Sequence, residues 1–202
     1  MKEKLIPQWL KITVSCYLCV FISIYWTLRG PTNFLWFSDI ALIVIAFALW
    51  LEHRFLASMM AVNALLPDIA WNVDYFSRLI FDSHLFGLES TAYMFKQETP
   101  ILIKILSFSF HFFLPILLIW TVFRLGYHRH AWKAQILLAW IVLLICYFFT
   151  DPAANINWVF GLGSEPQGWM SAPMYLVALM AFFPLAVYLP THLLLSHIFG
   201  KN

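Results

Sequence analysis

Six apolar runs divide the chain, and each is close to the length that an α-helix needs to cross a lipid bilayer. A helix rises about 1.5 Å per residue, so about 20 apolar residues span the roughly 30 Å of hydrocarbon. Hydrophobic residues make up 62% of the 202 residues and charged residues only 11%, which is far from the composition of soluble domains. We therefore predict an all-α fold, a polytopic transmembrane helix bundle of about six spans, at residues 9–28, 33–51, 55–81, 101–123, 133–150 and 173–198.

The connections between the predicted spans are short at the beginning of the chain. Only LRGPT separates the first span from the second, and EHR separates the second from the third. Helices joined so tightly must lie antiparallel beside each other. The first span follows MKEK but has no small-x-small cleavage site, so we predict a retained helix rather than a signal peptide. We expect residues 1–202 to form a single integral membrane domain.

Basic residues in the connections predict the orientation of the bundle. The end that holds the N terminus would carry eight of the twelve basic residues, Lys2, Lys4, Lys11, Arg54, Arg124, Arg129, Lys133 and Lys201. The opposite end would carry the other four, Arg29, Arg78, Lys96 and Lys104. An excess of this kind marks the cytoplasmic face, so both termini are predicted to be cytoplasmic. The formal net charge is only +2, which gives no indication of a nucleic-acid partner.

Carboxylates inside the apolar runs are the main functional signal. An ionised Asp at the centre of a membrane helix costs roughly 2.5–3.5 kcal/mol unless it is paired, hydrated or used. Asp39 on the second span, Asp68 on the third and His111 on the fourth all fall roughly 10–15 Å from the outer boundary. We expect them in one polar layer, and we predict that Asp68 and His111 are in hydrogen-bond or single-water contact.

These residues predict a polar pocket that opens toward the outer side. His111 would act as general base, Asp68 or Asp39 would orient it, and Ser38 would be the nucleophile. Five further residues would bind the substrate, namely Asn63, Asn72, Asn155, Asn157 and Trp158. In the outer loop at 151–172, the two asparagine amides would offer donors to a headgroup or to a developing oxyanion.

Structural interpretations compete with this functional one. Asp68 and Asn72 are four residues apart and can share a hydrogen bond, as Asp74 and Arg78 can on their helix face. Pro67 frees a backbone carbonyl that local polar groups can satisfy. A non-enzymatic lipid-binding or structural protein is therefore one alternative, and a small-solute or proton transporter is another. The apolar cytoplasmic halves of the spans favour a one-sided pocket over a channel.

No cofactor or metal site is predicted. Cys16, Cys19 and Cys146 lie in apolar runs without metal-ligand spacing, and the histidines in HLLLSH are five residues apart rather than four. The sequence has no glycine-rich phosphate loop and no nucleophile elbow. Haem binding has no support beyond the presence of histidines. Membrane lipids are the expected partners, and the sequence carries no signal for an oligomeric state.

Several short segments resemble a bacterial family of poorly characterised membrane proteins with six to seven spans. They are FLWFSDIALIVIA, ALLPDIAW, SFHFFLP, NINWVFG, EPQG and AVYLPTHLLL, within residues 30–195. Animal relatives of that family are described as acyltransferases that remodel ether phospholipids. The resemblance therefore implies a lipid-acting acyltransferase or hydrolase in a bacterial inner (cell) membrane. The family has a cysteine where this chain has Ser38, which argues against an acyl-thioester mechanism, and a serine nucleophile would need His111 as its base.

Overall fold

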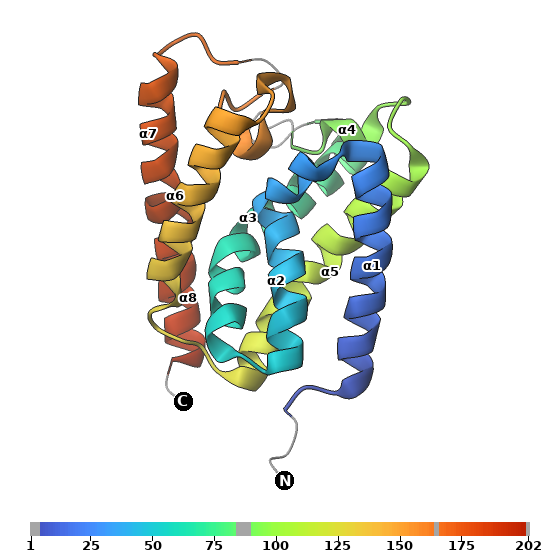
Figure 1. Ribbon diagram of the computed structural model, residues 1–202, viewed down its shortest axis with the longest axis vertical. Helices are drawn as coiled ribbons and strands as arrows, with labels where there is room; N and C mark the ends of the chain where they lie inside the picture. The colour runs from blue at the N-terminus through green and yellow to red at the C-terminus, as the bar shows by residue number, and fades with distance from the viewer. Residues whose placement is uncertain (1–4, 84–89, 164–165, 201–202) are drawn as a thin grey trace.

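The computed structural model describes residues 5–83, 90–163 and 166–200, and in these residues the chain is helical without any β-strand (Figure 1). The long elements are α1 (Gln8–Arg29), α2 (Phe37–Leu51), α3 (Arg54–Phe81), α5 (Ile101–Leu125), α6 (Ala131–Phe149), α7 (Ala172–Phe182), the π-helical η5 (Phe183–Tyr188) and α8 (Leu189–Phe199). The short ones are η1 (Pro31–Leu35), α4 (Ala92–Phe95), η3 (Pro152–Ala154) and η4 (Ile156–Trp158). The all-α prediction is confirmed for this part of the chain.

Among the described residues, four helical segments are long and apolar enough to cross a membrane. They are α1, α5, α6 and the continuous segment Ala172–Phe199, which joins α7, η5 and α8. Helix α2 is apolar but has only 15 residues, a length of about 22 Å. Helix α3 has 28 residues, but its apolar sequence is interrupted by charged side chains such as Asp68 and Asp74. The chain therefore has the architecture of a multi-pass membrane protein.

Helix α3 lies at the centre of the bundle and contacts α2, α5 and α6 (Figure 1). Its polar side chains, including Asn63, Asp68 and Asp74, are buried against these neighbours. Its opposite face is exposed and apolar, with Ile69, Val73, Phe76 and Ile80 at helical spacing. The helix thus turns its carboxylates toward protein and its apolar side chains outward, as a helix in contact with lipid does.

The two ends of the described chain lie at the same end of the bundle (Figure 1). Arg124 donates two hydrogen bonds to the backbone oxygen of Leu5, from Nη2 at 2.8 Å and from Nε at 3.1 Å. Arg129 donates to the backbone oxygen of Gly200 at 3.1 Å. Arg124 lies in the last turn of α5 and Arg129 in the short α5–α6 connection. These two side chains therefore tie this end of the bundle to the segment before α1 and to the residue after α8.

Two prolines explain why the last long helix is irregular. Pro184 lies within η5, and Pro190 follows it at the beginning of α8. A proline ring offers no N–H and clashes with the carbonyl four residues earlier, so the helix must widen or kink around it. The wider turn places Tyr188 in the core with no exposed surface.

Candidate functional site

The Asp68 carboxylate of α3 and the His111 imidazole of α5 form a buried pair. Asp68 Oδ1 lies 2.9 Å from His111 Nδ1, and the two side chains belong to the most extensively packed pair of helices. Asp68 is 1% exposed and His111 is 8% exposed. The predicted contact between these residues is therefore confirmed.

Aromatic rings hold the imidazole in place. The Trp71 indole stacks on the His111 ring with 4.3 Å between centroids and 15° between planes. The centroid of the Phe110 ring lies 3.9 Å from that of the imidazole, and the Tyr75 ring stacks on Trp71 with 5.4 Å between centroids. The sequence carries one signal for this role of Trp71, its position three residues after Asp68.

Asn72 joins the backbones of the two helices beside the pair. Its Nδ2 donates to the backbone oxygens of Asp68 and His111, at 2.7 Å each. His111 needs this donor because residue 115 is a proline, which has no N–H to donate to the carbonyl four residues earlier. The motif HFFLP therefore signals a carbonyl that a side chain has to satisfy.

Two polar atoms at this site have no hydrogen-bond partner in the described part of the chain. They are Asp68 Oδ2 and Asn72 Oδ1, and both are buried. A buried acceptor without a donor is costly, and such atoms in a native fold call for an explanation. The pair and the Asn72 amide thus present two unused acceptors.

Asp39 and Ser38 lie in the first turn of α2. Asp39 is 2% exposed and accepts a hydrogen bond from Asn33 Nδ2 at 2.6 Å. Its carboxylate lies close enough to Asp68 for the two charges to interact, but no hydrogen bond joins it to His111 among residues 5–83, 90–163 and 166–200. Ser38 is half-buried and likewise makes no hydrogen bond to His111 within those ranges. The structure thus brings Asp68, but neither of these two, to the imidazole.

Two tyrosines close enough to interact with Asp39 were missed by sequence reasoning. Tyr17 on α1 contacts the backbone oxygen of Leu106 at 2.9 Å and the hydroxyl of Ser109 at 2.8 Å. Tyr93 on α4 shares a hydrogen bond with the hydroxyl of Ser107. Tyrosine is common both in membrane-interface belts and in buried networks, so its presence in the sequence did not separate the two.

Asn63 belongs to a different buried network. Its Nδ2 donates to the backbone oxygen of Phe37 at 2.6 Å, and its Oδ1 accepts from Gln135 Nε2 at 2.7 Å. Gln135 also approaches the hydroxyl of Tyr188 at 3.4 Å. The Asn63 amide thus ties α3 to α2 and α6, and this occupies the groups that were expected to bind substrate.

Asn155 and Asn157 hold the loop after α6 in shape. Both have positive φ angles, 40° and 53°, which asparagine tolerates better than most residues. Asn155 Nδ2 donates to the backbone oxygens of Gly161 and Gly163. Asn157 accepts from the backbone N–H of Phe37 at 3.0 Å and donates to the backbone oxygen of Leu35 at 2.8 Å. Their amide donors are therefore engaged with backbone rather than free for a headgroup.

Trp158, the last predicted binding residue, also has a positive φ angle, 58°. Its ring meets that of Trp36 edge to face, with centroids 5.7 Å apart. This contact sits where the loop meets the beginning of α2. Trp158 thus has a packing partner of its own.

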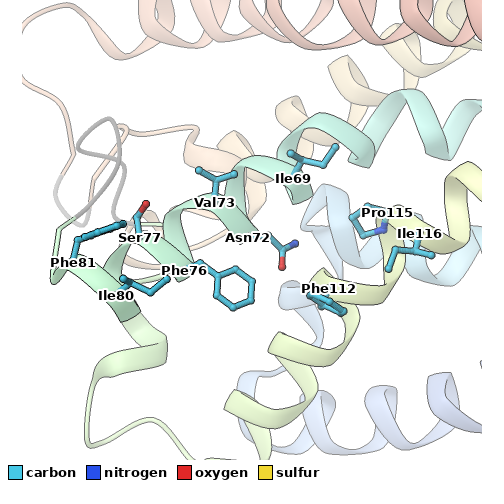
Figure 2. Close-up of a pocket in the computed structure, with 10 residues that line it drawn as sticks. All are labelled: Ile69, Asn72, Val73, Phe76, Ser77, Ile80, Phe81, Phe112, Pro115 and Ile116. Atoms are coloured by element: carbon cyan, nitrogen blue, oxygen red, sulfur yellow. The ribbon is translucent and has the colours of Figure 1, made fainter.

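An apolar groove of about 480 Å³ lies between α3 and α5 (Figure 2). Neither Asp68 nor His111 lines it, but Asn72 does, and Asn72 bonds to the backbone oxygens of both residues. Asn72 and Ser77 are its polar lining residues, and the others are Ile69, Val73, Phe76, Ile80, Phe81, Phe112, Pro115 and Ile116. Because most of these side chains are exposed, the groove opens on the flank of the bundle. It thus differs from the predicted pocket, which was polar and opened toward the outer loop.

The described residues contain no group of three or more His, Cys, Asp or Glu side chains that could hold a metal ion. The fold and the buried pair define a helical protein of the multi-pass membrane class. Comparison with known protein families, with curated proteins and with solved structures finds no match.

Proposed function

We propose that the chain crosses a bacterial inner membrane six times, with both termini in the cytoplasm, and acts on membrane lipids at the Asp68–His111 pair. Support for α3 as a span comes from its exposed apolar face and from its packing along α5, which has the length and hydropathy of a membrane helix. Helix α2 packs on both α1 and α3 and crosses with them. An even number of crossings brings both chain ends to the same side of a membrane, and the two ends of the described chain do lie at one end of the bundle (Figure 1).

Reporter fusions test this topology. A fluorescent protein that folds only in the cytoplasm and a phosphatase that is active only after export would each be fused after Asn202, and each would be inserted after Gly163 in the loop that follows α6. The fluorescent protein should be active at Asn202 and the phosphatase at Gly163. An active phosphatase at Asn202 would contradict the cytoplasmic terminus.

The chemistry that the pair supports best is acyl transfer from an ester, to water or to a lipid hydroxyl. His111 Nδ1 lies 2.9 Å from Asp68 Oδ1. With Asp68 ionised, Nδ1–H donates to the carboxylate, which leaves the lone pair of Nε2 as the base. Nε2 takes the proton of the attacking hydroxyl, whose oxygen bonds to the ester carbonyl carbon. The ester C–O bond then breaks, and the proton passes to the departing alkoxide. Water as attacker yields an acid and an alcohol, and a lipid hydroxyl yields a new ester and an alcohol.

Direct attack is the version of this mechanism that the geometry favours. A serine nucleophile needs its base within hydrogen-bond reach, and no hydrogen bond joins Ser38 to His111 where the chain is described. The groove between α3 and α5 offers a lateral path for an acyl chain from the bilayer. The resemblance to a lipid-remodelling family points to the same class of reaction. The 2.9 Å contact between Asp68 and His111 is the observation that carries the proposal.

Turnover of labelled lipids tests the proposed reaction. The full chain would be reconstituted in vesicles that contain phospholipids and acylglycerols with isotope-labelled acyl chains, and mass spectrometry would follow free acids and new esters. His111→Gln should lower the rate by about 10²–10⁴, the usual contribution of a general base. His192→Gln is the matched control, because His192 lies on α8 and bonds the Tyr127 hydroxyl of the α5–α6 connection, not Asp68 or His111. A wild type without turnover, or an active His111→Gln variant, would contradict the proposal.

A non-enzymatic role is the second candidate, and the burial of the pair favours it. Both side chains are less than a tenth exposed and lie where α3 and α5 meet, so the contact also serves to join the two helices. In that case the protein binds lipid in the groove without changing it. Loss of the pair would then lower stability alone.

A further inference from the structure

The Asn72 amide has one polar atom that the protein leaves unused. Its Nδ2 is committed to the backbone oxygens of Asp68 and His111, while Oδ1 is buried without a donor among the residues that the structure describes. Rotation of the amide by 180° would place Oδ1 against two carbonyl oxygens, so the two bonds fix the orientation. Asn72 therefore has an acceptor that only a donor from outside this part of the chain can satisfy.

The position of that acceptor indicates what the donor belongs to. Figure 2 shows the Asn72 side chain pointing into the α3–α5 groove, between the rings of Phe76 and Phe112. On the flank of a membrane-embedded bundle, hydrocarbon rather than water lies outside such a groove. The volume of about 480 Å³ falls within the roughly 300–1,000 Å³ of small-molecule sites. In a membrane-embedded bundle, a molecule that enters this groove from outside is a lipid.

The lining of the groove limits the class of lipid further. None of the ten residues that line it is charged, so it offers no partner to a phosphate, a carboxylate or an ammonium group. The lining is apolar apart from Asn72 and Ser77, which suits acyl chains. A neutral group that donates one hydrogen bond matches Asn72 Oδ1, and a hydroxyl is the simplest such group in a lipid.

We propose that the α3–α5 groove binds an uncharged lipid with one free hydroxyl, of the diacylglycerol type, and that this hydroxyl donates to Asn72 Oδ1. The inference rests on the proposed function, because it needs α3 and α5 to lie in the membrane, and it names the lipid class for that site. Phe112 is 37% exposed, so its ring can turn aside and admit the hydroxyl to the buried oxygen. Because Asn72 Nδ2 bonds to the backbone oxygens of Asp68 and His111, a hydroxyl bound to Oδ1 of the same amide lies next to this pair.

Competition between two matched lipids tests the proposal. The full chain in phosphatidylcholine nanodiscs would be labelled with a photoactivatable diacylglycerol, and dioleoylglycerol or trioleoylglycerol would compete. The two competitors share their acyl chains and differ in the free hydroxyl. Dioleoylglycerol should compete at about a tenfold lower concentration, which corresponds to one hydrogen bond of about 1.4 kcal/mol. The labelled peptides should come from α3 and α5.

Substitutions in the groove test whether the lipid binds there. Val73→Trp fills the groove from an exposed position of its lining and should reduce labelling at least tenfold without affecting the fold. Leu193→Trp is its control, because Leu193 is an exposed residue of α8 outside the groove. Asn72→Leu removes the acceptor and should abolish the preference for dioleoylglycerol. If that variant does not fold, the lipid pair and Val73→Trp still decide the question.

The outcomes separate this inference from the proposed reaction. Equal competition by the two lipids, or unchanged labelling of Val73→Trp, would overturn the lipid class even if His111-dependent turnover of other lipids were found. Selective diacylglycerol binding without any turnover would support the groove and overturn the reaction.

Discussion

The Asp68 carboxylate and the His111 imidazole are 43 residues apart in sequence and 2.9 Å apart between α3 and α5. The bond uses only one carboxylate oxygen, and Trp71 stacks on the imidazole face. A histidine bonded at Nδ1 and stacked on one face has a fixed ring plane. An ionised Asp68 accepts from Nδ1–H and so selects the tautomer with its lone pair on Nε2, as the carboxylate does in catalytic triads.

Asp68→Asn should separate catalysis from stability. The amide keeps the shape of the carboxylate but also offers a donor, which favours the imidazole tautomer with its lone pair on Nδ1 and removes the base from Nε2. We expect turnover per folded molecule to fall at least a hundredfold, while the unfolding free energy falls by about 1–3 kcal/mol. Unfolding in detergent and lipid turnover would be measured on the same preparation. Unchanged turnover with reduced stability would assign the pair a purely structural role.

A double-mutant cycle should reveal why Asn72 is needed. Pro115 removes the backbone donor for the His111 carbonyl, and Asn72 Nδ2 replaces it. Pro115→Ala restores that N–H, so the cost of Asn72→Leu should be smaller by about 0.5–1.5 kcal/mol in the Pro115→Ala background. Chemical unfolding of the wild type, both single variants and the double variant measures this coupling. Additive effects would show that the carbonyl does not depend on Asn72.

The helices could be predicted from the sequence because the hydropathy of a span is summed over about 20 residues, so single polar residues do not hide it. The run at 101–123 became α5 and the run at 55–81 became α3, each with ends within two residues. The second run is the exception: residues 31–35 form the separate turn η1, and α2 begins only at Phe37. A 3₁₀ turn and an α-helix have the same hydropathy, so this break left no signal in composition.

The candidate site was only partly predictable. Depth along each helix placed Asp68 and His111 at one level, which was enough to predict their contact. Depth does not give the rotation of a helix about its axis, and so it could not show that Asn63 turns toward Gln135 instead. Asn155 and Asn157 were predicted to bind substrate because the sequence does not show where the side chain of a loop residue points. Their backbone partners depend on the folded path of the loop.

Asn157 should matter for the junction between the outer loop and α2. Its side chain contacts the backbone of Leu35 and Phe37, and its φ angle of 53° is unfavourable for most residues. Asn157→Ala removes the bonds and adds strain, and we expect it to destabilise the protein by about 1–3 kcal/mol. Asn157→Gly removes the same bonds but tolerates the φ angle, so it should cost less. Equal unfolding free energies for the two variants would show that the backbone angle contributes nothing.

Glu52 should make the attachment of the N-terminal segment dependent on pH. Its carboxylate accepts from Lys11 Nζ at 2.8 Å and from the backbone N–H groups of Leu5 and Ile6 at 3.2 and 3.3 Å. The hydrogen bond from the Lys11 ammonium, helped by the two backbone donors and opposed by partial burial, lowers the pKa of Glu52 below its usual 4.5. A carboxylate with a lowered pKa stabilises the fold above the unfolded value, and this stabilisation is lost as the pH falls through the folded value.

Wild type and Glu52→Gln would therefore differ most in unfolding free energy above about pH 6 and converge as the pH falls below the unfolded pKa of 4.5 and through the lower folded pKa. Glutamine has nearly the same size and does not titrate, which makes it the matched control. Hydrogen exchange of residues 5–11 gives a local measurement, because protonated Glu52 loses its ionic bond to Lys11 and holds the backbone amides of Leu5 and Ile6 less strongly. The protection factors there, which correct for the slower intrinsic amide exchange at low pH, should fall on acidification in the wild type and should already be low at neutral pH in Glu52→Gln. A difference in stability that stayed constant from pH 7 to pH 3 would show that the Glu52 charge does not anchor this segment.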